Sequence, residues 1–393
     1  MKKILFSFFL LVLIHPVISQ ADNALARFSQ LKNAGLLMLD SKGKALISDH
    51  ANTPYIPAST TKLVTAWLAL NRWGESHRFK THFYFDKATH TLWVKGSGDP
   101  FLVSEELAVI AKNLKQRGVN QVDTIALDTS FFQHNLVMPG TGRTNNPYDA
   151  VPSALAANFN TVNIKKVNGK VVSAESQTPL TPYAKSMSKR FKKGKLRVNT
   201  GRDPRNAENY FAELLAAFLR QNGVKVGARI IGDNLPLHQP VYTHVNSKPL
   251  GEMIKPMMKY STNFIANQLV LKMSAEQYGR PANAADVQRY MQQTLANRFH
   301  WSKFTMKDGA GLSRANRLSP RQLVDLLQAF KPWKHLLPEI EQGVFAKSGT
   351  LNKVSTLAGF IEDNGQLKPF ALMMNQGVPY KFRNRIAREL AKK

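Results

Sequence analysis

The sequence predicts an α/β-type fold in which a sheet of antiparallel strands is flanked by helices. Two stretches carry the strand prediction. Residues 35–48, GLLMLDSKGKALIS, hold two short apolar runs around a Ser-Lys-Gly turn, as in a hairpin, and residues 343–375 read as a three-stranded meander. Helical patterns with recognisable start and stop signals lie between these stretches. A chain of 393 residues has room for two or three domains.

The N-terminal half alternates between helical and extended patterns. An apolar run predicts a helix over about 60–72, which Gly74 ends. Residues 79–100 alternate apolar and polar positions, as strands do, and then break at Gly-Ser-Gly-Asp-Pro. A helix over 105–117 and a strand over 122–127 follow, and the Pro-, Gly- and Asn-rich residues 139–150 predict a loop.

The C-terminal half is richer in helices. We expect a helix over 207–221, a strand over 224–231, and helices over 251–259 and 264–273, separated by Tyr-Ser-Thr-Asn. Ser319 and Pro320 are an N-cap and a first helical residue. Residues 381–391 form a basic helix with the stripe Phe382, Ile386 and Leu390. We expect that stripe to pack on the sheet, and a helix on a membrane surface is the alternative.

The first 21 residues have the pattern of a secretory signal peptide. Two lysines precede an apolar run over 4–17, and Ser19-Gln20-Ala21 is a small-x-small cleavage site. A retained membrane anchor is the alternative, although the run is short for a spanning helix. The sequence has no cysteine, which excludes disulfides, thiol nucleophiles and thiolate metal sites. We therefore expect an exported protein of the periplasm, cleaved near Ala21.

The chain is strongly basic, with a formal net charge of +28. Without the two lysines of the predicted signal peptide the charge is +26. Residues 185–205 are the densest basic cluster, with nine Lys or Arg and one acid, Asp203. A solvated surface is the plain interpretation, and contact with an anionic envelope polymer is the functional one. Export and the lack of nucleic-acid-binding motifs argue against nucleic acid as a partner.

A serine lies one helical turn before a lysine at Ser59 and Lys62, where an apolar run begins. Positions i and i+3 share a helix face, so the Lys62 amine is expected beside the Ser59 hydroxyl. An amine held neutral there can take the serine proton and activate the hydroxyl as a nucleophile. Alone, the pattern is common by chance and is more typical of an N-cap followed by a surface lysine. Two later clusters supply further polar groups: Ser261-Thr262-Asn263, and Lys347-Ser348-Gly349 followed by Thr350.

These three clusters, in this order, resemble the penicillin-recognising serine hydrolases, whose signature is S-x-x-K, S-x-N and K-[TS]-G. About 200 residues separate the first two motifs. This gap resembles D-alanyl-D-alanine carboxypeptidases and endopeptidases of the penicillin-binding protein 4 type (class C, low molecular mass), which carry inserted domains there. The resemblance covers nearly the whole mature chain through five blocks: VKGSGDP (94–100), SALAANFNTVNI (153–164), YSTNFIANQLV (260–270), DGAGLSRANRLSP (308–320) and FAKSGTL (345–351).

The resemblance implies a role for each motif residue. Ser59 is the expected nucleophile, Lys62 the general base with a depressed pKa, and Ser261 a proton relay to the leaving amine. Asn263 is expected to bind the substrate peptide amide. The backbone N–H groups of Ser59 and Thr350 would form an oxyanion hole. The substrate carboxylate would be held by the third cluster: Lys347, Ser348, Gly349 and Thr350. No cofactor and no metal are implied.

The implied activity is a periplasmic DD-carboxypeptidase, with DD-endopeptidase activity on cross-links, acting on peptidoglycan stem peptides and inhibited by β-lactams. Asp99 and Asp308 are ordinary turn formers and are left outside the catalytic set. The third motif reads K-S-G where the family usually has K-T-G, which leaves selectivity open. Rival readings are a β-lactamase or esterase, for which no E-x-x-x-N loop is found, and a non-catalytic envelope-binding protein.

The resemblance also implies the organisation of the chain. Ser59 is expected on a helix in the cleft between the antiparallel sheet and a helical lobe, as in the penicillin-binding and β-lactamase-like transpeptidase fold. The catalytic domain is expected in two parts, 22–95 and 243–393. An insert over 96–242 is expected to be mostly β and shorter than in the longest family members.

Overall fold

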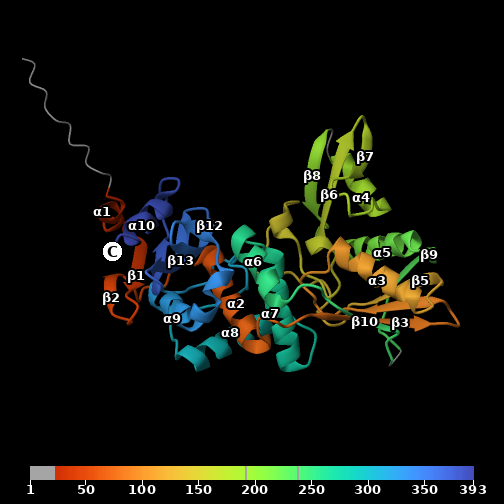
Figure 1. Cartoon of the computed structure of the whole chain (residues 1–393), viewed down its shortest axis with the longest axis horizontal. Helices are drawn as coiled ribbons and strands as arrows, with labels where there is room; N and C mark the ends of the chain where they lie inside the picture. The colour runs from red at the N-terminus through yellow and green to blue at the C-terminus, as the bar shows by residue number, and fades with distance from the viewer. Residues whose placement is uncertain (1–22, 191–192, 237–238) are drawn as a thin grey trace, which may run out of the picture.

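A computed structural model describes residues 23–190, 193–236 and 239–393 of the chain (Figure 1). The predicted signal peptide, residues 1–21, lies outside the described residues. Among the helices that are described, none has the length and apolar character needed to cross a bilayer. The predicted α/β fold, an antiparallel sheet flanked by helices, is confirmed.

A six-stranded antiparallel sheet contains strands from both the N-terminal and the C-terminal part of the chain. Its strand order is β11-β12-β13-β14-β1-β2, so the N-terminal hairpin pairs with the last strand of the C-terminal meander. Both the hairpin and the meander are where the sequence predicted them. The strands are β1 (Ala34–Leu39), β2 (Ala45–Asp49), β11 (Glu339–Glu341), β12 (Val344–Leu351), β13 (Val354–Asp363) and β14 (Gln366–Met374).

Helices cover both faces of this sheet because its strands bury residues on both sides. On one face α10 (Phe382–Leu390) and α1 (Ala24–Phe28) pack against alternate residues such as Leu36 and Met38. The apolar stripe of α10 is buried in that cluster, which confirms that it packs on the sheet. The other face meets α9 (Pro320–Phe330), which begins with the predicted Ser319 cap in a full capping box.

A lobe of helices lies beside the sheet, at the centre of the molecule (Figure 1). It consists of α2 (Thr61–Trp73), α6 (Leu250–Tyr260), α7 (Asn263–Tyr278) and α8 (Ala284–Phe299). From Asn263 to Ala275, every residue of α7 is buried, so this helix is the axis of the lobe. The lobe and the inner face of the six-stranded sheet share one hydrophobic core.

The middle of the chain forms two further sheets (Figure 1). The larger has the order β10-β3-β4-β5-β9: β3 (Lys80–Asp86), β4 (Thr91–Lys95), β5 (Gln121–Asp128), β9 (Lys225–Gly232) and β10 (Tyr242–Val245). The smaller has the order β7-β6-β8: β6 (Thr161–Val167), β7 (Lys170–Ser173) and β8 (Gly194–Asn199), with the short helix α4 (Pro182–Ser186) nearby.

The expectation of a mostly-β insert needs correction. Strands β4, β5 and β9 run parallel, and parallel neighbours need crossover connections, usually helices. The chain supplies α3 (Ser104–Gln116) for the first crossover and α5 (Pro204–Gln221) as part of the second. The two helices pack on each other and on the sheet, so the insert is mixed α/β.

The pairing of the strands indicates where the insert begins and ends, although the domain limits stay a prediction. Strands β3 and β4 lie before residue 96 but hydrogen-bond within the sheet of the insert, and β10 returns to that sheet at Tyr242–Val245. We therefore favour an insert that begins near Phe79 and ends near Asn246, whose backbone N–H donates to the Phe79 carbonyl at 2.9 Å.

Candidate active site

Ser59 lies on a tight turn at the start of α2, between the six-stranded sheet and the helical lobe. The turn is a 3₁₀ helix over Ala58–Thr60, and Ala58 has a φ of 48°. Positive φ is uncommon for a residue with a Cβ, and such conformations persist only where the surroundings enforce them. Here the hydroxyls of Thr60 and Thr356 both donate to the Pro57 carbonyl, at 2.7 and 2.8 Å, and fix the entry to the turn.

Two glycines make room for this turn on opposite sides. A Cβ on Gly349 of β12 would lie 2.8 Å from the Ser59 backbone nitrogen, and one on Gly311 would lie 1.8 Å from the Ala58 carbonyl oxygen. Gly311 also has a φ of +80°, which a larger residue rarely adopts. The nucleophile turn is therefore clamped between β12 and the loop that follows Asp308.

Lys62 is fully buried one turn after Ser59. Its Nζ lies 3.1 Å from Ser59 Oγ, 2.8 Å from Asn263 Oδ1 and 2.7 Å from the Ala310 carbonyl oxygen. A neutral amine has two N–H donors and one lone pair. Asn263 Oδ1 and the Ala310 carbonyl only accept, so they take the two donors, and the lone pair is left facing the Ser59 hydroxyl.

The surroundings of Lys62 favour this neutral form. Burial lowers the pKa of Lys62 well below its usual value, and the nearby charge of Lys347 lowers it further. The carboxylate of Asp308 acts in the opposite direction and raises this pKa. Desolvation is the largest of the three effects, so the amine is prepared to accept a proton.

The loop over Asp308–Ser313 is held rigid around the Asp308 carboxylate, which is completely buried. Its oxygens accept from the backbone N–H groups of Ala310, Leu312 and Ser313 at 3.0–3.1 Å. They also accept from Asn316 Nδ2 at 2.7 Å. Asp308 therefore has a turn-forming role, as its sequence context indicates, and its turn presents the Ala310 carbonyl to Lys62.

The second motif lies where α6 ends and α7 begins. Ser261 has the left-handed conformation, with φ 58° and ψ 42°, which breaks the helix as the sequence predicted. Asn263 is the first residue of α7; it contacts Lys62 through Oδ1 and donates from Nδ2 to the Tyr148 carbonyl at 3.0 Å. Within the described part of the chain, the Ser261 hydroxyl has no hydrogen-bond partner. It lines a cavity of about 470 Å³, together with Arg197.

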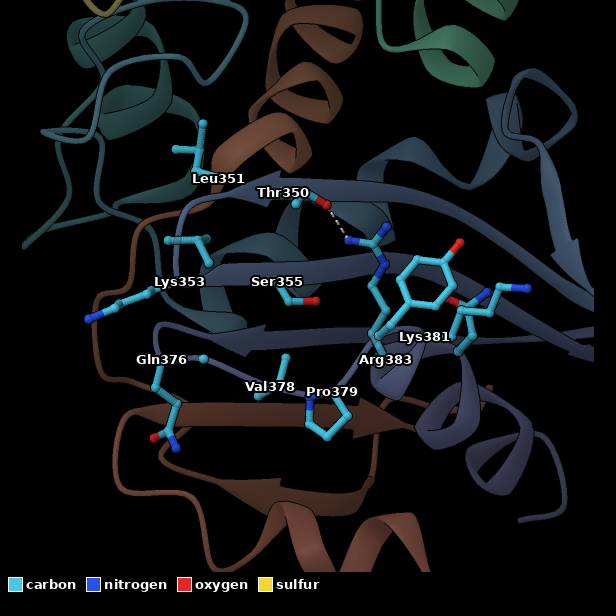
Figure 2. A pocket seen from close by; sticks show the side chains of 13 residues that line it. Thr350, Leu351, Lys353, Ser355, Gln376, Val378, Pro379, Lys381 and Arg383 are labelled. Atoms are coloured by element: carbon cyan, nitrogen blue, oxygen red, sulfur yellow. Dashed lines mark hydrogen bonds between the residues drawn. The ribbon is translucent and has the colours of Figure 1, made fainter.

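The third motif is on β12. Lys347 is 1% exposed, and its Nζ donates to the Ser348 carbonyl at 2.7 Å. Burial, and secondarily the nearby Arg383, lower the pKa of Lys347 to about 8. Arg383 of α10 donates to the Gly349 carbonyl at 2.8 Å and to Thr350 Oγ1 at 2.7 Å (Figure 2). The structure thus joins Ser59, Lys62 and Asn263 by direct contacts and places Lys347 as the nearby charge.

Sequence reasoning missed two groups at this site. The Ala310 carbonyl is a backbone acceptor, and no side-chain pattern marks it. Arg383 lies in the basic helix that was interpreted only through its apolar stripe. Its side chain nevertheless reaches the third motif. Across the described ranges, no cluster of three or more His, Asp or Glu side chains could hold a metal ion.

Comparisons with known proteins agree with the geometry. The model of the D-Ala-D-Ala carboxypeptidase 3 (S13) family matches residues 18–194 and 186–339 of this chain. The matched span includes the first two motifs and ends before Lys347. The chain is 24% identical over 416 residues to the D-alanyl-D-alanine carboxypeptidase DacB of Haemophilus influenzae, covering 87% of this chain and 85% of that protein. It is 25% identical to penicillin-sensitive carboxypeptidase A of Dictyostelium discoideum, covering 79% and 75%.

Solved structures share the fold. Penicillin-binding protein 4 (dacB) from H. influenzae matches with a TM-score of 0.75 and 22% identity, covering 94% of this chain and 100% of that one. The predatory endopeptidase Bd3459 of Bdellovibrio bacteriovorus, in complex with the immunity protein Bd3460, matches with a TM-score of 0.53 and 15% identity, covering 91% and 90%.

Proposed function

Because the chain belongs to the D-Ala-D-Ala carboxypeptidase 3 (S13) family, we propose that it is an exported serine DD-carboxypeptidase that also cleaves peptide cross-links as a DD-endopeptidase. Its substrates would be the D-Ala-D-Ala and D-Ala-diaminopimelate bonds of peptidoglycan stem peptides. The observation that carries this proposal is the contact between the Nζ of the fully buried Lys62 and Oγ of the partly exposed Ser59.

Acylation begins with the proton on Ser59 Oγ. The neutral Lys62 amine takes this proton while Oγ forms a bond to the carbonyl carbon of the scissile peptide. Negative charge then develops on the carbonyl oxygen. The backbone N–H groups of Ser59 and Thr350 are proposed to stabilise it, and the close approach of Gly349 to the Ser59 nitrogen supports this placement.

Collapse of the tetrahedral intermediate breaks the C–N bond, and the leaving amine needs a proton. Ser261 is proposed to relay that proton from Lys62, since it lies two residues from the Asn263 side chain that contacts Lys62. Its free hydroxyl faces a cavity rather than a structural partner. Water then attacks the acyl-enzyme, and Lys62 accepts a proton again.

The third motif is proposed to hold the substrate's terminal carboxylate. Lys347 supplies the charge, and the hydroxyls of Ser348 and Thr350 supply donors, since bonds to an ionised carboxylate are stronger than neutral ones. Gly349 contributes by its lack of a side chain. Asn263 is proposed to bind the substrate amide with the Nδ2 hydrogen that Tyr148 leaves unused.

Inhibition by β-lactams follows from the same chemistry, and the location follows from the sequence. β-Lactams should acylate Ser59, as the mechanism requires of any strained cyclic amide that fits the site. A structural relative, penicillin-binding protein 4 of H. influenzae, has been solved with a β-lactam bound. Periplasmic location is proposed from the signal-peptide pattern of residues 1–21.

Penicillin labelling tests this function. Wild-type protein should label covalently and release D-Ala from a pentapeptide, and Ser59→Ala should do neither. If Ser59→Ala still released D-Ala, the nucleophile would be misassigned. If wild type neither labelled nor hydrolysed, the chain would be an envelope-binding protein. Hydrolysis of penicillin at a rate comparable to peptide hydrolysis would instead favour a β-lactamase.

The basic residues of the insert are proposed to contact an anionic envelope polymer. Within the cluster over 185–205, Arg205 pairs with Asp203 and Arg202 donates to backbone carbonyls, so these two have structural partners. On the small sheet, Lys195 of β8 stands directly opposite Lys165 of β6, and both are exposed. Like charges in this position destabilise a sheet, and a bound polyanion would relieve the repulsion.

A further inference from the structure

A second pocket adjoins the candidate active site, on the face of the six-stranded sheet that carries α10. Figure 2 shows it between the turn that joins β12 to β13 and the segment that leads from β14 into α10. Its volume is about 460 Å³. Thr350 of the third motif forms part of its wall, so the pocket begins where the proposed carboxylate clamp ends.

The lining of this pocket is cationic. It contains Lys353, Lys381 and Arg383 and no aspartate or glutamate. None of the described residues forms an ion pair with any of these three cations. Lys353 lies at one end of the pocket, Lys381 lies towards the other, and Arg383 lies between them (Figure 2).

Arg383 is the central group. It is half-buried, and one nitrogen, Nη1, makes both of its contacts to β12, with the Gly349 carbonyl and Thr350 Oγ1. A guanidinium has five N–H donors in a planar fork, so Nε and Nη2 stay available. That arrangement suits a planar carboxylate, which accepts two bonds from such a fork.

Hydroxyls complete the pocket. Thr350 and Ser355 are directly opposite each other on β12 and β13, and residues in that position point to the same face of a sheet. Both lie on the face that bears α10, beside Arg383 (Figure 2). The exposed ring of Tyr380 and the ring of Pro379 are also part of the lining and offer apolar contact to a chain lying across it.

We propose that this pocket binds the leaving-group side of a cross-linked substrate, and that its ligand is a carboxylate-bearing peptide held by Arg383 and Lys353. The inference rests on the proposed function. In carboxypeptidase hydrolysis the leaving group is free D-alanine, whose only carboxylate is taken by the clamp on β12. In cross-link hydrolysis the leaving group is a whole stem peptide, which continues past Thr350 and brings further carboxylates to the pocket.

Such a pocket would make the enzyme more specific for cross-linked substrates. A cationic pocket beyond the clamp contributes binding energy only when the leaving group is long enough to reach it. It should therefore lower KM for a cross-linked dimer and leave the hydrolysis of a pentapeptide dependent on the clamp alone.

The test compares two substrates in the full-length mature protein. We would measure kcat/KM for a soluble pentapeptide ending in D-Ala-D-Ala and for a purified cross-linked dimer. Lys353→Gln and Arg383→Gln are the variants, and Lys42→Gln, an exposed lysine of the β1–β2 turn, is the matched control. Each pocket variant should lower the dimer-to-pentapeptide ratio of kcat/KM by about tenfold through KM, the loss expected for one hydrogen bond to a charged group at the low end of the usual range. The control should leave the ratio unchanged.

A second measurement separates binding in the pocket from an indirect effect through Thr350. Amidation of the carboxylates on the leaving stem, other than the one beside the scissile bond that the clamp holds, should reduce dimer hydrolysis by wild type to the level of Arg383→Gln and should not reduce hydrolysis by that variant further. Equal losses on both substrates would show that Arg383 only orients Thr350, and would overturn the proposal. An unchanged ratio for both variants would overturn it as well. Failure of the proposed function is a different result, because wild type would then act on neither substrate and would not label with penicillin.

Discussion

Gly349→Ala tests whether β12 must pass close beside the nucleophile. The added Cβ would lie 2.8 Å from both the Ser59 nitrogen and the Pro57 carbonyl oxygen, and 2.3 Å from Thr356 Oγ1. Ordinary contact begins at 3.4 Å, so the backbone approach falls short by about 0.6 Å. Two of the three atoms are backbone and cannot rotate away, so the strand and the turn must separate.

The expected effect is larger on catalysis than on stability. Overpacking of this kind typically costs about 1–3 kcal/mol of folding free energy. Displacing an oxyanion donor costs about 10²–10³-fold in rate, and a 1 Å misplacement of a reacting group about 10²-fold. We therefore expect Gly349→Ala to fold and to acylate with penicillin about 100-fold more slowly than wild type.

The assay is the second-order rate of labelling by a fluorescent penicillin, with thermal unfolding measured in parallel. Gly232→Ala is the control, since a Cβ there meets nothing within 4 Å and its φ lies outside the left-handed region. A Gly349→Ala protein that labelled within about threefold of wild type would refute the argument that β12 supplies the oxyanion position.

Three further predictions follow from the charges of the molecule. The positive charge of Lys347 is lost as pH rises through about 8, so kcat/KM for a D-Ala-D-Ala peptide should fall above that pH, and Lys347→Gln should remove this limb of the profile; a limb that persists in the variant would assign it to another group. Asp308→Asn removes the carboxylate that raises the pKa of Lys62, so the rising limb of the acylation profile should move to lower pH, and a move to higher pH would contradict the role given to Lys62. Lys165→Gln with Lys195→Gln should weaken sedimentation with isolated cell wall and reduce its salt dependence, while raising stability by roughly 0.2–1 kcal/mol; unchanged sedimentation would argue against the polyanion contact.

The sequence predicted the elements whose signals are local. The hairpin at the N-terminus, the C-terminal meander, the Ser319 cap and the break between α6 and α7 all lie where patterns of turn formers and apolar spacing placed them. The contact between Ser59 and Lys62 was also predictable, because a three-residue spacing on a helix brings two side chains together whatever the rest of the fold does.

What the sequence left open depends on contacts between distant segments. The strands β5 and β9 and the helices α3 and α5 were each predicted, but the insert was expected to be mostly β because a local pattern does not show that β4, β5 and β9 pair in parallel and need these helices as crossovers. Arg383 was hidden for a related reason. The apolar side chains of Phe382 and Ile386 account for the packing of α10 on the sheet, so the sequence gives no sign of a further role for this helix. Only the tertiary structure shows that the Arg383 side chain reaches Thr350.

The packing of the Ser59 turn between β12 and the loop that follows Asp308 has a consequence for the protein during its synthesis and folding. Ser59 and Lys62 are near the beginning of the chain, but the groups that hold them come from Asn263, Ala310, Gly311 and Gly349, up to about 290 residues later. An incomplete or still extended chain therefore carries the nucleophile without its activating surroundings. If the protein acts as proposed, such a chain should neither hydrolyse peptidoglycan nor react with a β-lactam, and penicillin labelling in the cell would count only molecules whose C-terminal strands have docked.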